Sequence, residues 1–166
     1  GPNKLASKLE GSKIFTKELC ERYNIPTANF KIIESLKNAE VSLKSFKYPL
    51  VIKADGLAAG KGVYICQNID EAKKAIDKIT VGLKFGEAGK KIVIEEFLEG
   101  KEISVFILTN GTEYKLFPIA QDYKRIGEND TGPNTGGMGA VSPVSFVDSE
   151  LIKKIEEQII KPTICL

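Results

Sequence analysis

Residues 48–66 read YPLVIKADGLAAGKGVYIC and carry the most informative pattern of the chain. Residues 49–54 form a short apolar run between a proline and the turn signal Asp55-Gly56, which is typical of a buried strand. Residues 63–66 resume the apolar character and predict a second strand. The segment between the two strands is rich in glycine and contains Lys61, so its backbone can approach a ligand closely.

This glycine-rich segment has the composition of a phosphate-binding loop, in which glycines turn backbone amides toward phosphate oxygens. It is not a Walker A loop, because three residues rather than four separate Gly56 from Gly60 and Gly62 replaces the hydroxyl residue. Lys53 ends an apolar strand, where a buried ammonium is costly without an anionic partner. This placement favours an anionic ligand, and the alternative is a glycine-rich hairpin that binds nothing.

Two further segments have compositions that suit ligand binding. Residues 95–102 (EEFLEGKE) end a predicted strand at 91–98 and suit an adenosine pocket, with Glu102 accepting from ribose hydroxyls. The alternative is a solvated acidic sheet edge. Residues 121–145 predict a long loop, in which Lys124 and Arg125 are suited to clamp a carboxylate or phosphate. The alternative is an exposed, salt-bridged loop.

Helices and further strands are predicted from periodicity. Residues 12–24 predict a helix capped by Ser12, and Asn68 with Glu71 forms a capping-box pattern before another helix. The apolar face of that second helix is expected to hold Ala72, Ala75, Ile76 and Ile79. A last helix is expected from about residue 148, with an apolar face at Leu151, Ile152, Ile155 and Ile159, ending before Pro162.

Strands are expected at residues 102–109 and 113–120, joined by a type I′ turn at Asn110-Gly111. Helices and strands are mixed without a regular alternation, which predicts an α+β fold of small lobes.

Composition excludes several classes of protein. The 166 residues are 42% hydrophobic and 28% charged, the range of a globular protein. Basic and acidic residues, 24 and 22 in number, are interspersed, so there is no basic stripe for nucleic acid. No apolar run approaches the ~20 residues of a membrane helix. Since no signal-peptide layout is visible either, we expect a cytoplasmic protein without a membrane partner.

The absence of histidine excludes Ser-His-Asp and Cys-His nucleophiles and histidine metal ligands. Cys20, Cys66 and Cys165 are too few and too far apart for a disulfide framework or a zinc site, so we expect reduced thiols. Chemistry in this chain must therefore depend on Lys, Arg, Asp, Glu and backbone amides, which are the groups that bind phosphates.

Four stretches in this order resemble the ATP-grasp core of the phosphoribosylamine–glycine ligase family. They are LEGSKIFTKELCERYNIPTA (residues 9–28), YPLVIKADGLAAGKGV (48–63), FGEAGKKIVIEEFLEGKEIS (85–104) and AQDYKRIGENDTGPNTGGMGAVSP (120–143). The resemblance covers nearly the whole chain, and the last stretch is the most specific. It implies a partial ATP-grasp fold, with a small antiparallel sheet lobe and helices.

The resemblance also implies roles for individual residues. Lys53 and Arg125 match catalytic positions. The implied ATP-binding residues contact phosphates, close over the triphosphate, hold adenine or bind ribose: Lys13, Lys53, Gly56, Gly60, Lys61, Gly62, Glu95, Phe97, Leu98 and Glu102. The implied residues for phosphoribosylamine and glycine are Asp122, Lys124, Arg125, Asp130, Thr131, Gly132, Pro133, Asn134, Thr135, Gly136, Gly137, Met138 and Gly139.

The family joins glycine to 5-phosphoribosylamine through a glycyl phosphate, using ATP and Mg²⁺ or Mn²⁺. The expected metal ligands lie outside this chain, which has no Glu-x-Asn sequence. We therefore expect an internal fragment of a ligase, missing an N-terminal domain and the metal-ligand region and inactive by itself. Tyr123 stands where the family usually has histidine. A non-catalytic nucleotide-binding fragment and another ATP-grasp carboxylate–amine ligase are the alternatives.

The resemblance implies three parts of the chain. Residues 1–47 are the first part of the core with its N-terminal helix, and residues 48–112 are the small lobe with the glycine-rich loop and the adenine hinge. Residues 113–166 begin the second lobe and contain the substrate loop.

Overall fold

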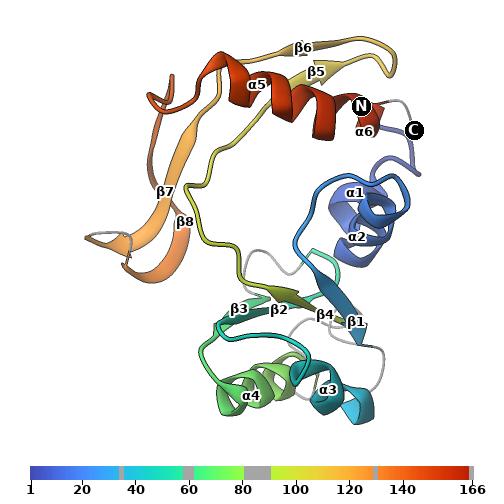
Figure 1. Cartoon of the computed structure of the whole chain (residues 1–166), viewed down its shortest axis with the longest axis vertical. Coiled ribbons are helices and arrows are strands. Elements are labelled where there is room, and N and C mark those ends of the chain that lie inside the picture. The colour runs from blue at the N-terminus through green and yellow to red at the C-terminus, as the bar shows by residue number, and fades with distance from the viewer. Residues whose placement is uncertain (34–35, 58–61, 81–90, 129–130, 165–166) are drawn as a thin grey trace. The chain divides into compact units, whose positions relative to one another are not determined.

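The computed structural model describes residues 1–33, 36–57, 62–80, 91–128 and 131–164. They form two compact units, Gly1–Leu98 and Glu99–Leu166 (Figure 1). Helices are combined with small antiparallel sheets, so the predicted α+β class is confirmed. The finer division at residues 47 and 112 stays a prediction. None of the helices in these ranges is both long and apolar enough to cross a membrane.

The first unit is built around a four-stranded antiparallel sheet with strand order β1-β4-β2-β3. The strands are β1 (Phe30–Ile33), β2 (Leu50–Ala54), β3 (Val63–Cys66) and β4 (Ile92–Glu96). The last three confirm predicted strands, although β4 is shorter than expected, and β1 was not predicted. Because β4 lies between β1 and β2, the predicted alternative of a solvated sheet edge is wrong for Glu95.

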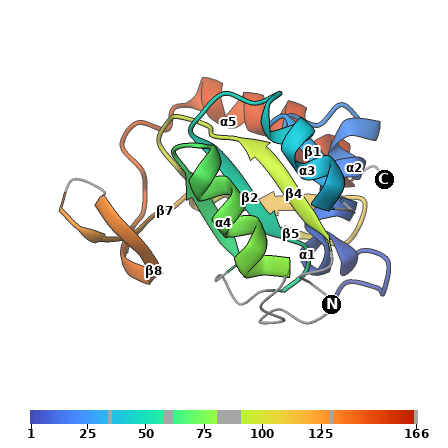
Figure 2. The same ribbon diagram turned by 90° about the horizontal axis from the view of Figure 1, so that it is seen from below.

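Helices α3 (Leu36–Leu43) and α4 (Ile69–Thr80) cover one face of this sheet (Figures 1 and 2). Successive side chains of a strand point to opposite faces, so every second residue of β2 and β4 points toward these helices. Together they enclose the apolar core. Its buried members are Ile33, Ala39, Leu43, Leu50, Ile52, Ala54, Cys66, Ala72, Ala75, Ile76, Ile79, Ile92 and Ile94.

The opposite face of the sheet carries polar side chains. Lys53 and Glu95 alternate with the core residues Ile52 and Ile94 and therefore point away from the core. Helix α2 (Lys13–Arg22), preceded by the short helix α1 (Lys8–Gly11), lies on this side (Figure 1). The sheet thus separates the apolar core from this polar face, where the charges lie beside the buried side chains of Val51 and Val93.

The predicted starts of α2 and α4 are confirmed by their caps. The Ser12 hydroxyl oxygen accepts from the Phe15 amide at 3.1 Å, and Asn68 Oδ1 accepts from the Glu71 amide at 3.0 Å. The Glu71 carboxylate accepts from the Gln67 amide at 2.9 Å, one residue before the position that a capping box uses.

The second unit contains two antiparallel pairs of strands. The pairs are β5 (Ile107–Thr109) with β6 (Tyr114–Leu116), and β7 (Gln121–Gly127) with β8 (Thr131–Val141). The strands predicted at 102–109 and 113–120 are therefore too long, since Ser104 and Ala120 meet only in an isolated bridge.

The prediction of a long loop at residues 121–145 is wrong, because β7 and β8 pair over most of it. The pairing shifts register between Tyr123 and Arg125 and again between Arg125 and Gly127. Gly132 and Gly137 adopt φ of 82° and 127°, which non-glycine residues rarely do. The glycines therefore allow a bulged hairpin where composition alone indicates a loop.

The predicted type I′ turn between β5 and β6 is also wrong. Thr109 pairs with Tyr114, so the connection spans residues 110–113 and is longer than the two-residue loop of a type I′ turn. Gly111 has a positive φ of 97°, and Asn110 Oδ1 accepts from the Thr112 and Glu113 amides at 3.0 and 2.8 Å. The Asn110 side chain thus organises this loop in place of a tight turn.

The C-terminal helix starts as predicted but does not end before Pro162. Asp148 caps α5 (Ser149–Ile155), which continues through the π-helical turn η2 (Glu156–Ile160) into α6 (Lys161–Ile164). The wider turn lets Pro162, which has no N–H, occupy the start of a new helical segment. The same turn shifts the helix face, so Ile159 is 42% exposed, contrary to the prediction, and Ile160 is buried.

Replacing Ile52 by alanine should lower the free energy of unfolding by about 2–5 kcal/mol, because it opens a cavity in a fully buried position. Urea unfolding followed by circular dichroism measures this. Val41→Ala on α3, whose side chain is 72% exposed, is the control and should change stability by less than about 0.5 kcal/mol. Equal effects of the two substitutions would contradict the assigned core.

The Cys66 thiol should resist alkylation in the folded protein. Burial raises the pKa of this thiol to about 11, so roughly one molecule in a thousand carries a thiolate at pH 8. Mass spectrometry of the Cys66 peptide after iodoacetamide treatment should show at least tenfold slower modification in the folded protein than in about 8 M urea, which is enough to unfold most small proteins. Equal rates would show that Cys66 is not in the core.

Candidate nucleotide site

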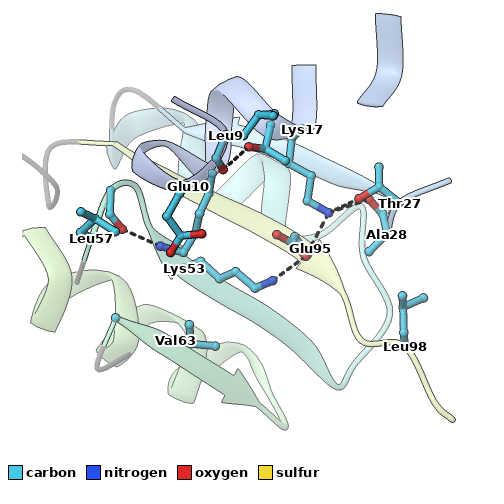
Figure 3. A pocket seen from close by; sticks show the side chains of 14 residues that line it. Leu9, Glu10, Lys17, Thr27, Ala28, Lys53, Leu57, Val63, Glu95 and Leu98 are labelled. Atoms are coloured by element: carbon cyan, nitrogen blue, oxygen red, sulfur yellow. Dashed lines mark hydrogen bonds and ion pairs between the residues drawn. The ribbon is translucent and has the colours of Figure 1, made fainter. Parts of the chain in front are cut away.

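A cavity of about 790 Å³ lies on the polar face of the first unit's sheet. Figure 3 shows Lys53 and Glu95 entering it from the sheet, Lys17 from α2, and Leu57 from the chain after β2. Its lining also includes Lys13, Thr27, Gly56, Gly62, Val63 and Leu98. Cations beside apolar walls, in a volume of this size, suit a small anionic ligand with an apolar part.

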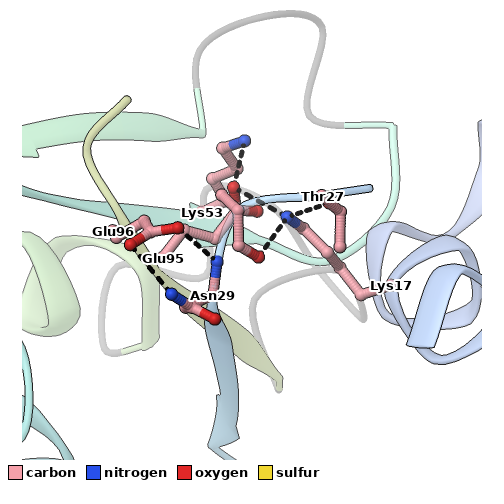
Figure 4. Close-up of polar contacts among 7 residues, drawn as sticks. Lys17, Thr27, Asn29, Lys53, Glu95 and Glu96 are labelled. Atoms are coloured by element: carbon pink, nitrogen blue, oxygen red, sulfur yellow. Dashed lines mark hydrogen bonds and ion pairs between the residues drawn. The ribbon is translucent and has the colours of Figure 1, made fainter. Parts of the chain in front are cut away.

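The carboxylate of Glu95 is the central charged group of the cavity, and the residue is only 4% exposed. Its Oε2 atom lies 2.9 Å from Lys53 Nζ and 3.1 Å from Lys17 Nζ (Figure 4). Its Oε1 atom is buried and accepts no hydrogen bond within the described ranges. Two cations from different elements therefore converge on one carboxylate oxygen.

Lys53 has a partner within the protein and is still accessible from the cavity. The anionic partner expected for this ammonium is present within the protein, as Glu95. The Lys53 side chain is nevertheless 27% exposed at the cavity, so it can also meet a ligand. The ion pair with Glu95 offsets the cost of partly burying the Lys53 ammonium, which remains accessible to an anion in the cavity.

A second charged group joins the start of α2 to the chain after β2. The Asp55 carboxylate accepts from the Ser12 hydroxyl at 3.1 Å and from the Ile14 amide at 3.1 Å. Next to it, Lys13 Nζ donates to the Gly56 carbonyl at 2.7 Å. Burial lowers the pKa of the Lys13 ammonium, and the nearby Asp55 carboxylate opposes this shift. These contacts place Lys13 beside the glycine-rich segment.

The end of β4 is tied to the chain entering β1. Glu96 accepts from the backbone amide of Asn29 at 2.8 Å and from its side-chain amide at 3.0 Å (Figure 4). These two bonds, the backbone one first, lower the pKa of the Glu96 carboxyl. They hold the backbone that leads to Phe97 and Leu98, and Leu98 lines the cavity with 65% of its surface exposed.

The second unit gathers several of the predicted substrate residues on the β7–β8 hairpin. Lys124 Nζ lies 2.9 Å from Glu102 Oε1 and 3.9 Å from Asp122 Oδ2. The hydrogen bond to Glu102 raises the pKa of the Lys124 ammonium. Thr135 on β8 donates its hydroxyl to the Lys124 carbonyl at 2.8 Å, which connects the two strands at this point.

The structure brings one group of the predicted ATP residues to one cavity: Lys13, Lys53, Gly56, Gly62, Glu95 and Leu98. Phe97 is not part of its lining, and Glu102 belongs to the second unit. Gly60, Lys61 and Asp130 lie outside the described residues. The ATP and substrate roles of all these residues stay predictions.

Sequence reasoning missed Lys17 and Asp55. Lys17 follows Lys13 by four residues in a predicted helix, which places both on one helix face. That spacing was the available signal for Lys17. Asp55 was interpreted only as part of a turn, and its capping of a helix 41 residues away has no local signal.

The fold of the chain, with its helices and small antiparallel sheets, is that of the ATP-grasp class. Within that class, the chain belongs to the family described as phosphoribosylglycinamide synthetase, ATP-grasp (A) domain, whose model matches residues 11–165.

Individual relatives agree with this assignment. The chain is 51% identical to phosphoribosylamine–glycine ligase of Mesorhizobium japonicum over 163 residues, which are 98% of this chain and 38% of the relative. It is 41% identical to the crystal structure of the Thermotoga maritima phosphoribosylamine–glycine ligase, with a TM-score of 0.86, covering 98% of this chain and 41% of that one. The chain thus spans about two fifths of these relatives.

A more distant structure shares the fold. It is the biotin carboxylase domain of the 2-oxoglutarate carboxylase of Hydrogenobacter thermophilus, with a TM-score of 0.80 and 19% identity. The match covers 99% of this chain and 36% of that chain.

Replacing Asp55 by alanine should lower the free energy of unfolding by about 1–2 kcal/mol, because α2 loses the acceptor of its Ile14 amide. Urea unfolding measures the change. Asp77→Ala, at an exposed position of α4, is the control and should be within about 0.5 kcal/mol of the unchanged chain. Equal stability of the Asp55 variant and this control would show that Asp55 does not cap α2.

Proposed function

We propose that the cavity of the first unit binds ATP and that the chain supplies the nucleotide-binding part of a phosphoribosylamine–glycine ligase. The observation that carries this proposal is the convergence of Lys13 and Lys53, from α2 and β2, on one cavity. Both residues match phosphate-binding positions of the family to which the chain belongs.

The cavity suits the parts of ATP in different ways. The ammonium groups of Lys13 and Lys53 offer charge-assisted hydrogen bonds to phosphate oxygens. The glycines at its rim, Gly56 and Gly62, have no side chain to block a close approach of the backbone. The apolar side chains of Val63 and Leu98, 40% and 65% exposed, offer surface for a purine ring. Glu102 is proposed to bind the ribose hydroxyls.

The proposed reaction is the one that the resemblance to this ligase family implies. A glycine carboxylate oxygen attacks the γ-phosphorus of ATP, forming glycyl phosphate and releasing ADP. The amine of 5-phosphoribosylamine then attacks the glycyl carbonyl carbon, phosphate leaves, and glycinamide ribonucleotide forms. Lys53 and Arg125 are proposed to stabilise the negative charge that develops during phosphoryl transfer.

A divalent cation, Mg²⁺ or Mn²⁺, would supply further charge neutralisation at the phosphates. The Hydrogenobacter thermophilus structure is described as containing magnesium ADP. In the part of this chain that the structure describes, no three carboxylate or cysteine side chains gather as a metal site. We propose that the described part of this chain holds the nucleotide through lysines, and that the phosphates provide ligands to the ion.

The β7–β8 hairpin is proposed to bind the other two substrates. Asp122, Lys124 and Arg125 on β7 provide an anion and two cations, which suit the ammonium and carboxylate of glycine and the phosphate of phosphoribosylamine. Residues 131–139 on β8 supply glycines, whose amides can approach these groups. The register, with Arg125 opposite Asn134, supports this grouping.

Replacing Lys53 by alanine should weaken binding of Mg-ATP at least tenfold, about 1.4 kcal/mol, because a phosphate contact is lost. Isothermal titration calorimetry on the folded chain measures the dissociation constant. Lys47→Ala, which removes an exposed lysine from the same unit, is the matched control and should leave binding unchanged. Binding unaffected by Lys53→Ala, or no binding to a folded unmodified chain, would overturn the site.

A further inference from the structure

The ammonium group of Lys17 is held by three groups of the protein. A lysine has three N–H donors. Lys17 Nζ donates to Thr27 Oγ1 at 2.7 Å and to the Ala28 carbonyl at 3.2 Å, and forms an ion pair with Glu95 Oε2 at 3.1 Å (Figure 4). The Lys17 side chain is 11% exposed. Two donors of Lys17 are thus used by neutral acceptors of the protein, and its charge is paired with Glu95, although the residue lines the cavity.

The ammonium group of Lys53 differs in each of these respects. Within the described ranges it meets a single acceptor, Glu95 Oε2 at 2.9 Å. Its side chain is 27% exposed, more than twice the value for Lys17. Two of its three donors thus remain for an anion in the cavity (Figure 3).

Lys17 and Lys53 share one oxygen of one carboxylate. A buried carboxylate that loses its only cationic partner is strongly destabilising, because the remaining charge is uncompensated. The other oxygen of Glu95 accepts no hydrogen bond from the described residues, so it offers no compensation. With both lysines present, one of them can leave Glu95 and the carboxylate remains paired.

We infer that Lys17 is a positioning residue of the ATP site. It neutralises Glu95 permanently, so that Lys53 can move from Glu95 to a phosphate oxygen when nucleotide binds. No covalent bond or proton transfer is involved, only an exchange of the anion that Lys53 contacts. This inference rests on the proposed ATP binding, and Lys17 itself does not contact the nucleotide.

The test compares Mg-ATP binding to four forms of the chain by calorimetry: unmodified, Lys17→Met, Glu95→Gln and the double variant. Methionine keeps much of the length of the lysine side chain and removes its charge. Lys17→Met should weaken binding at least tenfold, because Lys53 then remains as the sole partner of Glu95. Lys31→Met, at an exposed position of β1, is the matched control and should bind as the unmodified chain does.

The double variant separates this role from a merely structural one. Glu95→Gln removes the charge that holds Lys53, so Lys17→Met/Glu95→Gln should bind Mg-ATP within about threefold of Glu95→Gln alone. If Lys17 only anchors α2 through Thr27 and Ala28, the double variant will stay as weak as Lys17→Met, and the inference falls. Equal binding by Lys17→Met and the unmodified chain would also overturn it.

Adenosine provides a further readout, because it lacks the phosphates to which Lys53 would move. Its affinity, measured by NMR titration, should change less than threefold in Lys17→Met. An equal loss for adenosine and ATP would show damage to the base pocket and would contradict the inference.

Failure of the proposed function gives a different pattern. If the unmodified, folded chain binds no ATP, the ATP site is wrong, and urea unfolding without ligand decides the role of Lys17. Lys17→Met should lower the unfolding midpoint, and Glu95→Gln in the same chain should restore most of it. Purely additive effects of the two substitutions would show that Lys17 does not neutralise Glu95.

Discussion

The buried carboxylate of Glu95 connects the parts of the first unit that form its cavity. It lies on the polar face of a sheet whose other face is the apolar core, and its burial requires cations. Lys17 ties α2 to this carboxylate, and Lys53 reaches it from the neighbouring strand β2. The start of α2, with Lys13, is thereby held beside the chain that follows β2. The cavity is the space that these elements enclose.

The register of the sheet connects this site to the stability of the fold. Lys53 is paired with Val93, and Val51 with Glu95, so Lys53 and Glu95 are diagonal neighbours on one face. The alternate residues Ile52 and Ile94 form the core beneath α3 and α4. A slip of one residue would place the charges in the core and the isoleucines in the cavity. Burial of the core therefore also fixes the positions of the charges.

The β7–β8 hairpin shows how glycine can build a strand that composition does not predict. A side chain at Gly137 would place its Cβ 3.0 Å from Asp122 Oδ1, and the φ of 127° there disfavours any other residue. Glycine thus brings the backbone of β8 close to the Asp122 carboxylate. The chemistry proposed for this hairpin depends on that close approach as much as on its charges.

Caps, periodicity and motif order are signals that can be found in the sequence without the structure. They predict the helix starts at Ser12, Asn68 and Asp148, the strands β2 and β3, and the family. The sequence did not show that Lys53 pairs with Glu95, 42 residues away, that Lys17 contacts the same oxygen, or that residues 121–127 and 131–141 pair as strands. Those features depend on strand order and register. They join residues that are far apart in the sequence and meet only in the folded chain, so they are seen only in the tertiary structure.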